Sequence, residues 1–569
     1  MKLNYKKTLL VGFAFFLIMA FWQAYDSIVP MMLVNKFGLN QTLSGVIMSL
    51  DNIIALFMLP LFGTLSDKTK TKFGRRTPYI VIGTVIAAVS FFGLTFADNA
   101  QLAKIGDADS KTFYSELFEL DGTISNAEYN AISNKEVENS YSVKDYAAII
   151  NFNVKYSELD EEQKVAVKEW FTGINEEYFS DHSKPETTYA YKDGKYYVSG
   201  EIDGEVIEKA YIHNAYANLI TPSRSNYAWS KTVANPLPFV FFGILLLITL
   251  LAMATFRSPA VALMPDVTIK PLRSQANAVI NLMGTAGGML VLVLGIVFGT
   301  GKTFNQMMSY TPFLGAVCAI MVIALLVFIW KVKEPKWVNE MEEESVKYGI
   351  EYKKEAEKDV TTSKKLTKSE FISLILILAS VALWFIGYNA VTSKYSLYAT
   401  NVLHKDYNTT LLIAQGAAII SYVPVGMLAR KIGRKKSILA GIIMLTAAFF
   451  GAIFMTSSSP SILLNVLFAL AGIGWATINV NSFPMVVELA SGGNVGKFTG
   501  YYYTASMAAQ IVTPILSGAL MDMMGSYRPL FYYATVFVSL AFFTMLFVKH
   551  GDNKPEKKVS VLEEFDVEN

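Results

Sequence analysis

The sequence is poor in the residues that build most catalytic and metal sites. It has one cysteine, Cys318, and four scattered histidines in 569 residues. A single cysteine excludes an intramolecular disulfide, and without His/Cys clusters we expect no bound metal. There is no phosphate-binding loop, no Gly-x-Ser-x-Gly turn and no basic tract typical of nucleic-acid binding. We therefore expect no enzyme, no cofactor, no nucleotide-driven pump and no nucleic-acid partner.

Charge is also scarce. Charged residues make up 17% of the chain, against about 25% in a soluble domain. Hydrophobic residues make up 53% and gather in runs of about 20, enough for a helix to cross a lipid bilayer. We predict an all-α polytopic membrane protein. The predicted transmembrane helices lie near 8–34, 42–62, 78–97, 237–256, 276–299, 310–331, 370–393, 409–428, 437–456, 461–487, 499–521 and 527–548.

The twelve runs form two groups of six, which predicts two six-helix bundles. Excess Lys and Arg lie in alternate loops, and such loops stay in the cytoplasm, so we expect a plasma-membrane protein with both termini cytoplasmic. The predicted segments are helices 1–3 (1–97), an outer insert (98–236), helices 4–6 (237–331), a cytoplasmic linker that is helical around Val338 to Glu357 (332–369), the C-terminal bundle (370–549) and a polar, frayed cytoplasmic tail (550–569).

The insert 98–236 is rich in acids and has patterns of both strand and helix. Asp193-Gly194 separates Thr188–Lys192 from Lys195–Ser199, which is typical of a β-hairpin. Residues Glu161 to Phe179 have helical spacing. We predict a small mixed α/β domain outside the membrane, acting either as a structural appendage or in substrate capture or partner docking.

A dense positive loop, Gly63 to Pro78, joins the second and third apolar runs. Asp67 is expected to pair with Arg75 or Arg76 and to accept hydrogen bonds from the N-terminus of a neighbouring helix. Gly74 permits a turn that is open to few other residues. The loop is either a topological signal alone or a gating latch.

A second copy of this loop favours the latch. Gly426 to Lys436 lies at the same place in the second half, with Arg430 where the first copy has Asp67. The repeat indicates an internal duplication. The residues that we assign to gating are Gly63, Asp67, Gly74, Arg75, Arg76, Gly433 and Arg434.

These loops resemble the motif Gly-x-x-x-Asp-Arg/Lys-x-Gly-Arg/Lys-Arg/Lys of the major facilitator superfamily. The longer first copy, Ser-Asp-Lys-x-x-x-x-Phe-Gly-Arg-Arg-x-Pro-Tyr-Ile, is similar to that of the sucrose–proton symporters and, more loosely, of the glycoside–pentoside–hexuronide:cation symporters. The resemblance covers most of the chain outside the insert. It implies two six-helix bundles, alternating access and symport of a sugar or glycoside with a cation.

The resemblance also bears on the coupling ion. Melibiose-type symporters carry an aspartate pair in helix 2, and the matching positions here are Ala55 and Leu59. This departure favours H⁺ over Na⁺. The stretch from Arg257 to Asp266 is similar to the sucrose-symporter segment whose arginine is tied to proton-coupled transport. The alternative is that Arg257 ends helix 4 as a cytoplasmic anchor paired with Asp266.

Two acids lie inside predicted helices. An ionised side chain at the centre of a bilayer helix costs about 2.5–3.5 kcal/mol, so Asp26 and Asp51 need a reason to be there. Each acid either binds sugar hydroxyls, carries the coupling proton or makes a structural ion pair. We favour Asp51 for the proton and Asp26 for the sugar, because Asp26 shares a helical face with Gln23. The residues that we assign to cation coupling are Asp51, Arg257 and Asp266.

Amide, carboxyl and aromatic groups recur inside the other helices. This mixture suits a sugar cavity, although each residue alone is as well explained by helix packing. The residues that we assign to substrate binding are Gln23, Asp26, Asn281, Trp384, Tyr388, Asn389, Asn479 and Gln510.

We therefore predict a secondary active transporter that takes up a sugar or glycoside with a cation, H⁺ rather than Na⁺, and that acts as a monomer. The alternatives are an exporter of drugs or lipids, which would have a greasier cavity, and a nutrient sensor with a transporter fold. A sensor would not need a coupling carboxyl.

Overall fold

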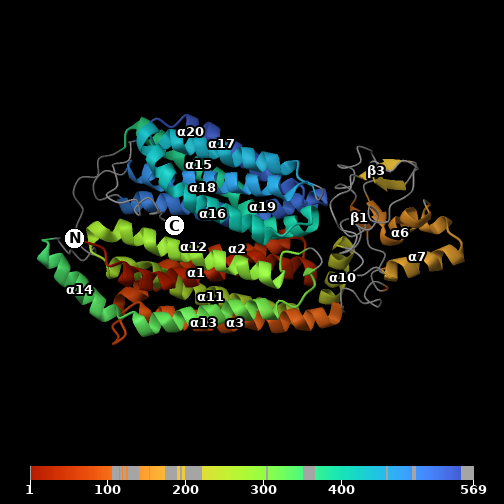
Figure 1. The fold of residues 1–569 in the computed structure, drawn as a ribbon, viewed down its shortest axis with the longest axis horizontal. Helices are drawn as coiled ribbons and strands as arrows, with labels where there is room; N and C mark the ends of the chain where they lie inside the picture. The colour runs from red at the N-terminus through yellow and green to blue at the C-terminus, as the bar shows by residue number, and fades with distance from the viewer. Residues whose placement is uncertain are drawn as a thin grey trace.

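The computed structural model describes residues 2–105, 115, 118–119, 123–125, 140–152, 154–173, 189–192, 195–198, 221–302, 305–349, 366–456, 459–489 and 495–552. Within these residues, twelve helices are long and apolar enough to cross a membrane. They form two layers of six, the first half of the chain below and the second above in Figure 1. The predicted fold class is confirmed.

The N-terminal half contains six of these helices. They are α1 (Tyr5–Met31, continued by the π-helical turn η1, Met32–Lys36), α2 (Gln41–Lys68), α3 (Thr77–Ile105), α11 (Leu237–Asp266), α12 (Arg273–Phe298, preceded by the 3₁₀ turn η4, Lys270–Leu272) and α13 (Thr311–Lys331).

The C-terminal half repeats the pattern. Its helices are α15 (Lys368–Tyr398, continued by the π-helical turn η6, Ala399–Leu403), α16 (Tyr407–Ile432), α17 (Arg434–Ile453), α18 (Ser461–Val487), α19 (Val495–Met524) and α20 (Pro529–Leu546). The first helix of each half thus ends in a π-helical turn, as expected of a duplicated unit.

Each half has its own hydrophobic core, and α1 contributes to both. Most buried side chains of α1 pack in the N-terminal core, while Met31 and Val34 pack in the C-terminal core. A buried ion pair also fixes the end of α1. The Lys36 Nζ lies 2.6 Å from the Asp98 Oδ2 of α3, and both side chains are fully buried. Lys36 also donates to the Met308 carbonyl at 2.7 Å.

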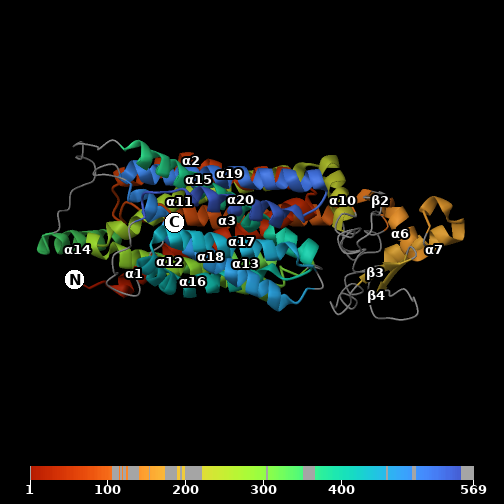
Figure 2. The ribbon, with the colours of Figure 1, turned by 90° about the horizontal axis from the view of Figure 1, so that it is seen from above.

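The helices run between two different ends, which we call the insert end and the linker end (Figure 2). At the linker end, α14 (Glu334–Lys347) follows α13. Lys7 ties it to the N-terminus, with its Nζ 3.2 Å from the Glu340 carboxylate. Helix α14 begins four residues before the predicted start at Val338. The rest of the linker, 350–365, and the tail, 553–569, lie outside the described residues.

The described parts of the insert contain both strands and helices, in agreement with the predicted mixed class. Strands β1 (Thr123–Ser125) and β2 (Ser140–Ser142) pair antiparallel, as do β3 (Tyr189–Lys192) and β4 (Lys195–Val198). Helices α6 (Val143–Phe152) and α7 (Glu161–Gly173) are joined by the 3₁₀ turn η2 (Tyr156–Glu158). The predicted turn at 193–194 and the residues 174–179 lie outside the described residues.

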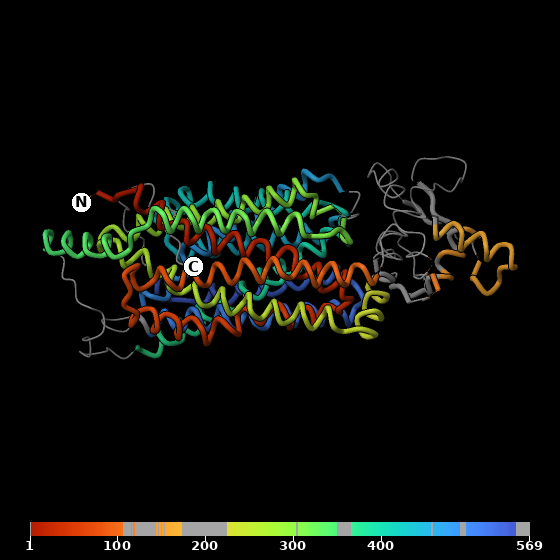
Figure 3. The backbone as a smooth tube through the Cα atoms, turned by 90° about the horizontal axis from the view of Figure 1, so that it is seen from below, coloured from red at the N-terminus to blue at the C-terminus, as the bar shows by residue number. Residues whose placement is uncertain are grey.

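The insert returns to the membrane through α10 (Thr221–Ala234), which lies across the insert end of the N-terminal half (Figure 3). The Thr232 hydroxyl donates to the Phe37 carbonyl at 2.9 Å, and Gln101 donates to both the Lys36 carbonyl and Thr232. Gly38 has φ +71°, and a Cβ there would strike the backbone of α10 at Ser225 and Trp229. The turn after α1 is therefore packed directly against the base of the insert.

We predict that Gly38→Ala detaches this base. The left-handed backbone costs a non-glycine residue about 1–2 kcal/mol, and the clash with α10 adds to that cost. The melting temperature should fall, and protease should cut near 221 faster than in the parent protein. Gly349→Ala is the matched control, because Gly349 has φ +64° but a Cβ there meets nothing within 4 Å. Equal effects of the two substitutions would contradict the packing argument.

Candidate functional site

Three helices of the N-terminal half bring charged residues together inside the membrane region. Asp26 and Tyr25 come from α1, Asp51 from α2 and Arg257 from α11. Asp51 interacts electrostatically with both Arg257 and Asp26, and Tyr25 interacts with both acids. The guanidinium of Arg257 lies 5.9 Å from the centre of the Trp22 ring. Because α11 continues to Asp266, Arg257 lies inside a membrane helix and not at its end as the sequence suggested.

The C-terminal half faces this cluster with aromatic and amide groups. The rings of Tyr388 on α15 and Trp475 on α18 stack with centres 3.6 Å apart and an interplanar angle of 4°. Tyr388 interacts electrostatically with Asp26. The Gln415 Nε2 of α16 donates to the Gln23 Oε1 of α1 at 2.7 Å. The predicted residues Gln23, Asp26 and Tyr388 therefore meet where the two halves meet.

Several polar atoms on the helices that meet here lack a partner among the described residues. They are the Trp22 Nε1, the Tyr25 hydroxyl, the Asn389 Nδ2 and the Gln415 Oε1, all buried. Buried polar groups are nearly always hydrogen-bonded, so a group of unpaired ones indicates a place for water or a polar ligand. Sequence reasoning missed Tyr25, although its position next to Asp26 on a buried helix was a usable signal.

The other predicted binding residues differ in their burial. Trp384 is fully buried in the C-terminal core. Asn281, Asn479 and Gln510 are half-buried on α12, α18 and α19. Thr285 donates to the Asn281 carbonyl at 3.0 Å. A role for these four in substrate binding stays a prediction.

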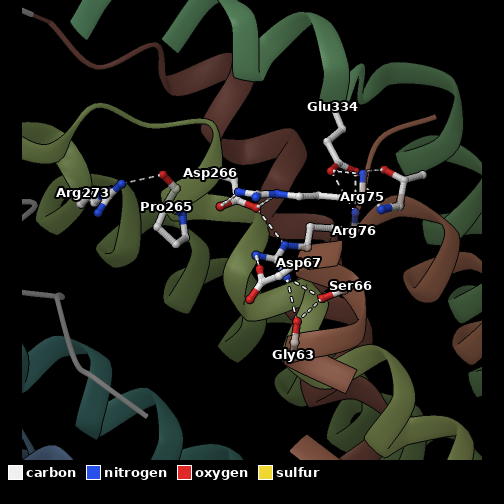
Figure 4. A network of polar contacts seen from close by, with 10 residues as sticks. Gly63, Ser66, Asp67, Arg75, Arg76, Pro265, Asp266, Arg273 and Glu334 are labelled. Carbon is white, nitrogen blue, oxygen red and sulfur yellow. Dashed lines mark hydrogen bonds and ion pairs between the residues drawn. The ribbon is translucent and has the colours of Figure 1, made fainter. Parts of the chain in front are cut away.

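The loop between α2 and α3 forms a charged network at the linker end (Figure 4). The Arg76 Nη2 lies 2.5 Å from the Asp67 Oδ1, and Arg76 also donates to the Ser66 hydroxyl. The Asp266 carboxylate, at the end of α11, lies 2.6 Å from the Arg75 Nη2 and 2.8 Å from the Arg76 Nε. Asp266 is therefore part of this network and not a partner of Arg257.

Glu334, which sequence reasoning missed, holds the start of α3. Its carboxylate accepts the backbone N–H groups of Arg75, Arg76 and Thr77 at 2.7 to 2.9 Å. These donors have no partner within the helix. An anion at this place is also stabilised by the positive end of the helix dipole. The sequence assigned such a role to Asp67. Gly74, with φ +108°, leaves the space that the Glu334 carboxylate fills.

The second loop repeats this arrangement with other residues. Arg434 forms an ion pair with Glu488, just after α18, as Arg75 does with Asp266 at the end of α11. The Lys435 backbone N–H donates to the Asp552 Oδ1 at 2.8 Å. Gly433 has φ +91°, and a Cβ there would contact the same carboxylate. Glu334 and Asp552 each follow the last helix of their half, so the duplicated register could have revealed both.

The profile of the Major Facilitator Superfamily matches residues 227–490 and 411–566, which together cover more than half of the chain. The chain belongs to the Major Facilitator Superfamily. A second profile, described as MFS/sugar transport protein, matches residues 10–106. The protein is accordingly a membrane transporter and not an enzyme. No curated protein matches the sequence.

Solved structures of other transporters share the fold. The inward-open xylose transporter XylE from E. coli is 13% identical, with a TM-score of 0.54 over 99% of both chains. A D-xylose–proton symporter is 12% identical, with a TM-score of 0.52 over 96% of this chain and 99% of that one. A bacterial homologue of the iron transporter ferroportin, in its inward-facing state, is 12% identical, with a TM-score of 0.50 over the same shares.

We predict that Glu334→Ala disturbs the linker end more than Asp67→Asn does. Glu334 is 1% exposed and its loss strands three backbone donors, each costing about 1–3 kcal/mol. The Asp67 side chain is 58% exposed, and exposed ion pairs contribute about 0–1 kcal/mol. Glu334→Ala should lower the melting temperature by several degrees more than Asp67→Asn.

Both substitutions should slow transport while substrate binding is largely kept, because the network lies at one end of the helices. Initial uptake rate and binding affinity in proteoliposomes measure the two effects. Glu340→Ala, on the same helix as Glu334 but paired at the surface with Lys7, is the control. Lost binding with unchanged turnover would contradict a latch.

Proposed function

We propose that the protein is an H⁺-coupled symporter of a sugar or glycoside. The observation that carries this proposal is the composition of the central cluster: two carboxylates, Asp26 and Asp51, interact electrostatically, with Arg257 beside Asp51. The group thus holds one more acid than base, so one negative charge is left without an opposite charge when all three side chains are ionised. An unpaired charge that is buried lowers the stability of the protein. A proton on one carboxyl balances the cluster when a neutral substrate is bound.

The substrate class follows from the groups opposite the acids. Sugars are bound by paired polar groups and by aromatic rings against their apolar faces. Here Asp26 interacts electrostatically with Tyr388, whose ring stacks on Trp475. The amides of Gln23 and Gln415 bond to each other across the two halves. The shared fold with xylose transporters supports the same class.

The two acids are expected to differ in role. Asp51 interacts electrostatically with Arg257, so a change in its protonation alters an interaction between α2 and α11. Asp26 lies beside Tyr388 of the other half and shares a face with Gln23. We therefore assign the proton to Asp51 and sugar hydroxyls to Asp26, with Asn389 as a further amide donor.

The coupling role gives a sharp expectation for Asp51→Asn. The amide keeps the size and hydrogen bonding of the carboxyl but cannot titrate, so the variant should exchange substrate across proteoliposomes yet fail to accumulate it when a pH gradient is imposed. Labelled xylose and a disaccharide panel, first ranked by thermal shift, serve as substrates.

Asp26→Asn is the matched comparison and should lose binding and exchange together, by about tenfold or more. If both variants still accumulate sugar against a gradient, neither acid couples the proton. If the parent protein binds and moves no sugar of the panel while its fold is intact, the substrate class is refuted.

We further propose that the linker end faces the cytoplasm and that the insert lies outside the plasma membrane. The basic loop from Lys68 to Arg76, which stays inside by the charge rule, lies at the linker end. Protease added to intact cells without an outer wall should therefore cut within 98–236 and spare 332–369. Cleavage of 332–369 instead would invert this orientation.

A further inference from the structure

At the insert end, a carboxylate of the C-terminal half holds the start of a helix in the N-terminal half. Asp522 lies near the end of α19, and α2 begins beside it. The Gln41 N–H donates to the Asp522 Oδ1 at 2.9 Å. The Thr42 N–H and hydroxyl donate to the Oδ2 at 2.8 and 2.5 Å. These N–H groups have no partner within α2, so one half supplies a cap to a helix of the other.

A buried lysine adds to this contact. Lys394 of α15 is fully buried, and its Nζ donates to the Gln41 carbonyl at 2.8 Å and to the Gln41 Oε1 at 3.2 Å. It also interacts electrostatically with Asp522. The Gln41 Nε2 in turn donates to the Tyr527 hydroxyl at 3.1 Å. Gln41 is thus held by three residues of the opposite half.

Small residues let the two helices come close enough for this cap. A Cβ on Gly45 of α2 would strike the Pro514 carbonyl of α19, and a Cβ on Gly518 of α19 would strike the Gln41 carbonyl. Backbones approach closely in membranes where one partner is glycine. The Asp522 carboxylate can therefore reach the backbone of α2 directly.

A second seam at this end contains no charged pair in its described contacts. Thr300, after α12, bonds to the Tyr407 hydroxyl at 3.0 Å and accepts from the Asn408 Nδ2 at 3.1 Å. That seam has one carboxylate in its described contacts, Asp406, against Gly301, so the charged pair of the closure is Asp522 with Lys394. Water solvates a carboxylate, an ammonium and a helix N-terminus well. The contact of Asp522 and Lys394 with α2 can therefore open without leaving its polar groups unsatisfied, because water replaces the lost hydrogen bonds.

We propose that Asp522, with Lys394 and the first turn of α2, forms an outer lock that sets the balance between the two access states. The lock is made only while the insert end is closed, and its strength decides how readily that end opens. The proposal rests on alternating access but not on the substrate or the coupling ion. Its test therefore uses the conformation of the substrate-free protein.

The test is a pair of spin-label distances in a Cys318→Ala background. Labels at Lys302 and Ser461 report the insert end, and labels at Lys72 and Lys431 report the linker end; all four positions are exposed. Asp522→Asn should raise the ratio of insert-open to insert-closed protein by about tenfold or more, because hydrogen bonds to a charged group are lost. The insert-end distance should lengthen while the linker-end distance shortens.

Two further variants make the result decisive. Thr42→Val removes only the hydroxyl contact and should give a smaller shift in the same direction, which serves if Asp522→Asn does not fold. Asp160→Asn is the matched control and should leave both distances unchanged. Asp160 also accepts a backbone N–H group, that of Gln163 at 2.8 Å, but this contact lies within the insert and not between the halves. Unchanged distances in folded Asp522→Asn or Thr42→Val protein, or distances that lengthen at both ends, would overturn the proposal.

Discussion

The compensation of charge inside the bilayer is the constraint on which the rest of the structure depends. Lys36 and Asp98 show the fully compensated case: both are buried, they lie 2.6 Å apart within one half, and they join the end of α1 to α3. Asp26, Asp51 and Arg257 show the other case, in which charges of one half are left unequal where the halves meet. A complete pair can stabilise a fold by itself, whereas we propose that a bound proton balances the incomplete group.

The ends of the helices use charge differently from the centre. At both ends, carboxylates bind backbone N–H groups at the start of a helix, where the dipole favours an anion and water can replace it. Glu334 does so within the N-terminal half, so its contact can persist while the halves move. Asp522 does so between the halves, so its contact cannot persist. The same chemistry therefore serves as a fixed brace at one end and as a breakable contact at the other.

Hydropathy predicted the twelve helices and the two halves, because bilayer thickness acts locally along the chain. The pairing of Asp67 with Arg76 was also predicted. The partners of Asp266 were not, since α11 runs ten residues past the predicted end at 256 and carries Asp266 to the loop. Contacts such as Glu334 with Thr77 or Asp522 with Thr42 join distant segments, and periodicity carries no information about them.

The two loops together show which part of the duplicated motif the structure requires. Asp67 has become Arg430 in the second copy, so that position tolerates reversal of charge. What both copies keep is a left-handed glycine, Gly74 or Gly433, beside an acid that follows the last helix of the half. The glycine has no Cβ, and this leaves the carboxylate room to reach the backbone at the start of the third helix. The invariant element is therefore this cap, and the exposed Asp67 side chain is an addition to it.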